Sequence, residues 1–126
     1  MNVLLFALGS FTLLLAVVHV VGGGRGVLRP MLGARFDPTA RATMHVVWHA
    51  ITAHLVLAGA VMVGVSLGAW PEGGALLVGA VSVLHLVFAG LFLTVAATSS
   101  LPRAWLALGQ WMAFLPLGLL GLWAVA

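Results

Sequence analysis

The chain has 126 residues, of which 63% are hydrophobic and only 6% are charged, whereas about 25% of the residues of an ordinary soluble domain are charged. Such a chain has too little polar surface for a water-soluble fold and too much apolar surface for a disordered one. Its cations are all arginine and too few for a basic stripe, so no nucleic acid is expected as a partner. The absence of cysteine excludes disulfides and thiolate metal sites. The composition is typical of a membrane protein, with the lipid bilayer as its first partner.

Charged residues divide the chain into four uncharged stretches, each long enough for the ~20 residues that a membrane-spanning helix needs. Backbone polar groups must be paired within a segment that lies in lipid, which favours helices over open strands. We therefore predict one all-α domain over 1–126, an integral membrane four-helix bundle with up-down-up-down topology. The expected helices lie near 2–22, 42–68, 74–97 and 103–125.

Glycine, proline and capping residues predict where the helices are connected. Gly22–Gly24 is expected to end the first helix, and Arg25–Arg41 then forms the longest soluble segment. Asp37 precedes a proline and is suited to cap the second helix. A turn is expected at Trp70–Gly74, and Pro102 is suited to open the fourth helix.

The arginines predict the orientation in the membrane. Four of them lie between the first two helices and Arg103 precedes the fourth, whereas the middle connection carries only Glu72. The positive-inside rule then places both arginine-bearing segments in the cytoplasm and both termini outside it, in a bacterial inner membrane. Trp70 and Trp123 fall near the outer interface and Trp105 near the inner one.

Small and weakly polar residues recur at helical spacing on the first two helices. Such stripes are the faces through which membrane helices pack. The first helix carries Gly9, Thr12, Ala16, His19 and Gly23. The second helix carries His45, His49, Thr52, Gly59 and Ser66. We therefore expect the three histidines of these stripes to point into the bundle. Gly64 and Gly68 form a further small-residue pair for helix packing or dimerisation.

Three histidines near the arginine-bearing end form a candidate metal site. His45 and His49 are four residues apart, which places both imidazoles on one helical face, and His19 on the first helix supplies a third nitrogen. Gln110 is a further candidate at this depth. The motif has no glutamate between its histidines, so a zinc hydrolase is not supported.

A second pair, His54 and His85, lies deeper. Both residues are expected at roughly 18–20 Å from the cytoplasmic boundary, just beyond the mid-plane. Two histidines on two helices can ligate a haem iron from both sides, and the loop arginines can pair with the propionates. The candidate cofactors are therefore haem b or a transition-metal ion. The alternative for each histidine is a hydrogen bond to a neighbouring helix, or, for His45, simple solvation at the interface.

These observations lead to three hypotheses of function. The first is a protein that binds haem b or a transition metal for electron transfer or redox chemistry, with a quinone as a candidate partner. The second is a non-catalytic accessory or assembly subunit of a homo-oligomer or larger membrane complex, in which the histidines only link helices. The third is a small metal or proton transporter that uses the histidines as a relay.

Three segments resemble a pattern of small uncharacterised bacterial four-helix membrane proteins: His19–Arg25, Arg29–Leu32 and Trp48–Thr52. In that family a histidine near the end of the first helix precedes a Gly/Arg loop and a Pro-Leu step, and a Trp-His pair opens the second helix. The resemblance covers about the first half of the chain. It implies the four-helix topology and points to His19 and His49, and it implies no activity.

Overall fold

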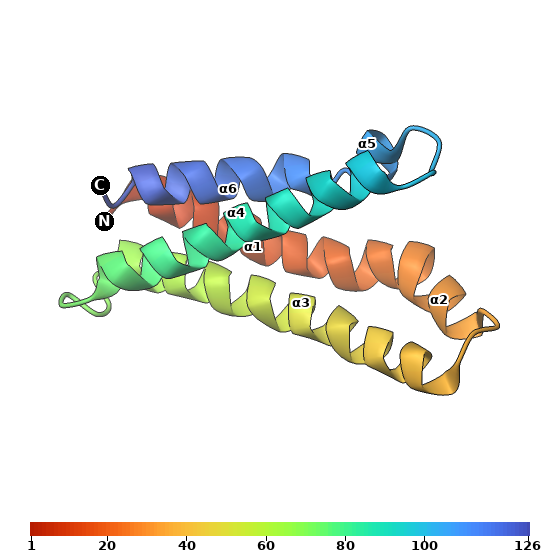
Figure 1. Cartoon of the computed structure of the whole chain (residues 1–126). Helices are drawn as coiled ribbons and strands as arrows, with labels where there is room; N and C mark the ends of the chain where they lie inside the picture. The colour runs from red at the N-terminus through yellow and green to blue at the C-terminus, as the bar shows by residue number, and fades with distance from the viewer.

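The computed structural model describes all residues 1–126, and they form an all-helical structure without strands. The elements in chain order are α1 (Val3–Val18), the π-helix η1 (His19–Leu28), α2 (Arg29–Gly33), α3 (Pro38–Ser66), α4 (Gly74–Thr98), α5 (Ala104–Ala107) and α6 (Trp111–Trp123). The long helices run alternately up and down (Figure 1). Both termini and the α3–α4 turn lie at one end, and the α2–α3 and α4–α5 connections lie at the other.

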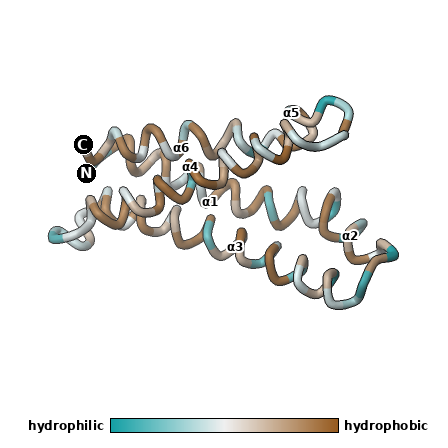
Figure 2. Tube along the Cα trace, viewed as in Figure 1, coloured by the Kyte–Doolittle hydropathy of each residue, from teal (hydrophilic) through white to brown (hydrophobic).

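Three helical segments are long and apolar enough to cross a membrane: Val3–Gly33, Pro38–Ser66 and Gly74–Thr98. The α6 helix is apolar but has only 13 residues. Hydrophobic residues extend along all the long helices, and hydrophilic ones gather mainly at the connections (Figure 2). The prediction of an all-helical chain is confirmed, and these three segments have the length and apolar character predicted for membrane-spanning helices.

The first helix was expected to end at Gly22–Gly24. It instead continues through η1 and α2 to Gly33. Glycine disfavours a helix in water, but in this segment the backbone groups remain paired in the wider π-helical pattern. One glycine has a packing role, because a Cβ added to Gly23 would lie 2.7 Å from the Trp48 ring. The soluble segment expected at Arg25–Arg41 therefore shrinks to the few residues before Pro38.

The α3 helix begins as predicted on its cap. The Asp37 carboxylate accepts a hydrogen bond from the Ala40 N–H at 2.9 Å, and proline follows at the first helical position. The helix ends near Gly68, whose positive φ of 92° suits a glycine. The Trp70 ring packs over Gly64. The Gly64 and Gly68 pair thus terminates α3 and seats a tryptophan, instead of packing against another long helix.

The expected helix at 103–125 is interrupted. The short α5 is followed by a turn at 108–110, and α6 begins only at Trp111. The Trp111 Nε1–H donates to the Trp105 carbonyl across this turn at 3.1 Å. Gln110 is exposed in the turn, so it does not join the histidines.

The helices pack as two antiparallel pairs, α1 along α3 and α4 along α6. Gly9 and Gly59 bring α1 and α3 into close contact, because a Cβ on either glycine would lie within 3 Å of the backbone of the other helix. This confirms that part of the predicted stripes. The two pairs meet around a small apolar cluster with one residue from each of α1, α3, α4 and α6: Ala16, Leu55, Ala89 and Phe114.

Candidate functional site

His54 on α3 and His85 on α4 lie side by side where the two helix pairs meet. Their ring centroids are 5.0 Å apart and their planes are inclined by 75°. The His85 side chain is 0% exposed and His54 is half-buried. The proximity expected from their matching depth is therefore confirmed, whereas their role as cofactor ligands stays a prediction.

The surroundings of this histidine pair are apolar. The Phe88 ring lies 4.8 Å from His54 and the Phe114 ring lies 5.7 Å from His85, measured between centroids. Leu55 and Ala89 in the same region are almost fully buried. In such an interior, hydrogen-bonding groups must find partners within the protein, or remain unpaired.

Three ring nitrogens of the pair are buried without a hydrogen-bond partner in the protein. They are Nε2 of His54 and both Nδ1 and Nε2 of His85, and the hydroxyl of Ser82, one turn earlier on α4, is unpaired as well. Each unpaired buried group costs about 1–3 kcal/mol. Such a cost, concentrated on adjacent imidazoles, marks a functional candidate because imidazole nitrogens are good metal ligands.

The spacing of the rings fits a single ion. Two imidazoles that bind one ion at ~2.0–2.1 Å in tetrahedral geometry have ring centroids roughly 5 Å apart. The observed 5.0 Å between His54 and His85 agrees with this value. A metal ion between the two rings would occupy lone pairs that the protein leaves unused.

Haem b does not fit between His54 and His85 as they are placed. Two axial imidazoles on opposite sides of a haem iron have centroids roughly 6 Å apart, with the flat macrocycle between them. Here the centroids are only 5.0 Å apart, and Phe88 packs directly against His54. Two hollows of the protein, along α1 and η1, are lined by other residues. The arrangement favours a single metal ion over a macrocycle.

His45 and His49 form a second pair, which faces outward. Their Nε2 atoms are 3.1 Å apart, so one imidazole donates a hydrogen bond to the other. His49 is exposed, contrary to the expectation that it points into the bundle. The reason is the rotation of ~100° per residue along the helix, which places His49 roughly 80° around the helix from Gly59 and Trp48 within roughly 20° of it. Trp48 therefore occupies the face that meets α1.

His19 has a structural environment. Its ring stacks on Trp48 with centroids 3.9 Å apart, and its Nε2–H donates to the Trp48 carbonyl at 3.3 Å. It is not joined to His45 and His49, because no group of three or more histidine, aspartate or glutamate residues lies close enough to hold a metal ion. The three-histidine site predicted from the sequence is thus not formed.

Sequence reasoning missed two contributors. The small-residue stripe expected on the second helix leaves out Trp48, although its position eleven residues before Gly59 matches three full helical turns and places it on the packed face. Ser82 carries no sequence signal, because nothing in its type or spacing distinguishes an unpaired hydroxyl from a paired one.

Comparisons with protein-family models, with curated proteins and with solved structures found no match for this chain. The resemblance noted in its first half therefore stays a prediction. The interpretation of the site rests on the geometry of His54, His85 and their neighbours.

Proposed function

We propose that this chain is a four-helix integral membrane protein that binds one transition-metal ion between His54 and His85 and uses it for electron transfer or redox chemistry. The observation that carries the proposal is the set of three unpaired, buried ring nitrogens on two adjacent imidazoles. The interrupted segment Ala104–Trp123 serves as the fourth crossing, with α6 as its membrane-embedded part.

The ligand type narrows the choice of metal. Imidazole suits copper, iron, nickel and zinc, whereas magnesium and calcium prefer oxygen ligands. A redox role excludes zinc, and no carboxylate stands close enough to complete the larger ligand sets of non-haem iron. Of the two that remain, copper binds a nitrogen site more tightly than nickel, so copper is the metal that we expect. When bound, it supplies a one-electron couple, and a quinone in the bilayer is a candidate electron partner.

In this proposal the protein's own residues bind the ion and exclude water from it. Phe88 and Phe114 pack against the two imidazoles and limit the access of water. The arginine-bearing end faces the cytoplasm of a bacterial cell, and both termini lie outside it, because cationic segments are retained on the cytoplasmic side.

Metal analysis of the purified protein tests the proposal. The detergent-solubilised protein, loaded with copper under reducing conditions and then desalted, should retain about one ion per chain. His54→Ala and His85→Ala should each abolish this retention. His45→Ala is the matched control, because it removes a histidine from the outward-facing pair, and it should retain the ion.

Three results would overturn the metal proposal. In the first, the wild-type protein retains neither copper nor another transition metal. In the second, the His54 and His85 variants retain as much metal as the wild type. In the third, the wild type shows a Soret band that both variants lack. The last result would restore haem b as the cofactor.

The second candidate function is a non-catalytic accessory or assembly subunit. The environment of His19 favours it, because that histidine connects two helices through a hydrogen bond and a ring stack and has no need of a ligand. In this case the purified protein is colourless and metal-free. The protein would then be isolated with a larger membrane complex, and a histidine substitution would change only stability or assembly.

A further inference from the structure

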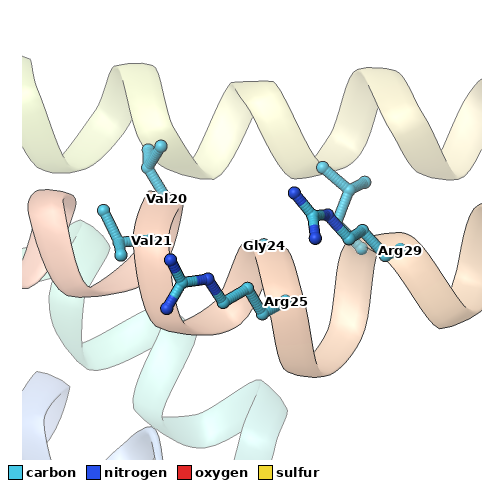
Figure 3. A pocket seen from close by; sticks show the side chains of 6 residues that line it. Val20, Val21, Gly24, Arg25 and Arg29 are labelled. Carbon is cyan, nitrogen blue, oxygen red and sulfur yellow. The ribbon is translucent and has the colours of Figure 1, made fainter.

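A hollow of about 330 Å³ lies on one face of the first helical segment. It is lined entirely by residues of η1 and the start of α2: Val20, Val21, Gly24, Arg25, Leu28 and Arg29. Figure 3 shows that the Arg25 and Arg29 side chains both turn back along the helix toward Val21, so that their guanidinium groups lie over this hollow. The two cations are one helical turn apart and act on the same space.

A second, apolar hollow of about 420 Å³ lies between α1 and α3. Leu13, Val17 and Val56 are among its lining residues. Val20 and Val21 line both hollows, so the two form one continuous groove. The groove is apolar at its α1 end and cationic at its η1 end.

The protein supplies little negative charge to the cationic end. Asp37 is engaged with the Ala40 N–H at the start of α3. Glu72 lies in the α3–α4 turn, at the opposite end of the molecule (Figure 1). An anion for Arg25 and Arg29 must therefore come from outside the chain. Guanidinium groups are well suited to phosphate, because they donate two parallel hydrogen bonds to its oxygens.

We propose that this groove binds one anionic phospholipid, with its phosphate between Arg25 and Arg29 and an acyl chain along the apolar part. The stretch from Leu13 to Val21 rises ~12 Å along the helix, which is close to the ~15 Å thickness of one leaflet of the hydrocarbon core. The groove thus has the length, the apolar lining and the terminal charge that such a lipid requires. The proposal rests on the membrane location proposed above and is independent of the metal site.

The experiment measures lipid binding to the delipidated full chain by native mass spectrometry. The probes are phosphatidylglycerol and phosphatidylcholine with identical acyl chains, and soluble glycerol phosphate. The wild type should bind phosphatidylglycerol roughly tenfold or more tightly than phosphatidylcholine, since each arginine near the surface strengthens binding to an anionic lipid severalfold. Arg25→Gln/Arg29→Gln should abolish this preference.

The matched control is Arg35→Gln/Arg103→Gln, which removes the same charge from two exposed arginines outside the groove. It should leave the lipid preference unchanged. Val21→Trp, which fills the point where the two hollows join, should weaken binding of both lipids. Each variant is first required to remain monodisperse and helical in detergent.

Three results would overturn the lipid proposal. A preference that survives Arg25→Gln/Arg29→Gln excludes these arginines as the headgroup site, and an equal loss in the control pair shows only a general charge effect. Displacement of the lipid by an equal concentration of glycerol phosphate shows a site for free phosphate. Metal retention should be the same in all these variants, so failure of this proposal is distinguishable from failure of the metal proposal.

Discussion

Two contacts between helices, each built on a histidine that is at least partly buried, differ in how their polar atoms are satisfied. Between η1 and α3, His19 donates to the Trp48 carbonyl and stacks on its ring. Between α3 and α4, His54 and His85 face each other in an apolar setting with three ring nitrogens unpaired. The comparison teaches that burial of a histidine does not by itself indicate function. The informative quantity is the number of ring nitrogens that the protein leaves without a partner.

The largest expected effect is on stability, at the contact of His54 with His85, whose ring nitrogens are unpaired. His85→Leu replaces an unsatisfied polar ring with an apolar side chain, so it should stabilise the metal-free protein by about 1–3 kcal/mol. Unfolding in mixed micelles with a chelator present measures the change. Destabilisation of the metal-free protein would show that His85 has a satisfied, structural role, and the contrast with His19 would be lost.

The second prediction tests how a glycine of η1 supports the contact of His19 with Trp48, in which the hydrogen bond is formed. Gly23→Ala should destabilise the protein by about 1–3 kcal/mol, because the new Cβ would lie 2.7 Å from the Trp48 ring that His19 stacks on. Gly24→Ala is the control, since no atom lies within 4 Å of a Cβ there. It should be neutral or slightly stabilising, as alanine favours a helix more than glycine. Equal effects of the two substitutions would contradict the packing role of Gly23.

The smallest expected effect concerns His19 itself. His19→Ala removes one hydrogen bond between helices and should lower stability by about 0.6–1.7 kcal/mol, with no change in metal content. His45→Ala, on the outward-facing pair, should change stability by less than about 0.5 kcal/mol. Loss of bound metal in His19→Ala would place His19 in the metal site and so remove the distinction between the two contacts.

Sequence reasoning succeeded where one local rule decides the outcome. The charge pattern located α3 and α4, Asp37 marked the start of α3, and the recurrence of small residues identified the contact of Gly9 with Gly59. The juxtaposition of His54 and His85 followed from depth alone, because two antiparallel helices that connect at one end share a common register.

The failures have a common cause, because each required knowledge of a neighbouring segment. Gly22–Gly24 reads as a helix end only if the backbone faces water, and here it continues beside Trp48. The outward position of His49 arises mainly because the three-residue step from His49 to Thr52 falls roughly 60° short of a full helical turn, and the seven-residue step from Thr52 to Gly59 adds only roughly 20° in the same sense. The unpaired nitrogens of His85 depend on what α3 and α6 place around it, which no local pattern records.

The arrangement of the helices as two antiparallel pairs has a consequence for assembly. Each pair consists of segments that are consecutive in the chain, so each can form as a helical hairpin before the hairpins dock. His54 belongs to the first hairpin and His85 to the second, and they meet at the seam between the two. An ion bound by both histidines would cross-link the two hairpins. Two fragments separated at the turn between Trp70 and Gly73 would then assemble into a stable heterodimer when copper is supplied, and dissociate when it is chelated.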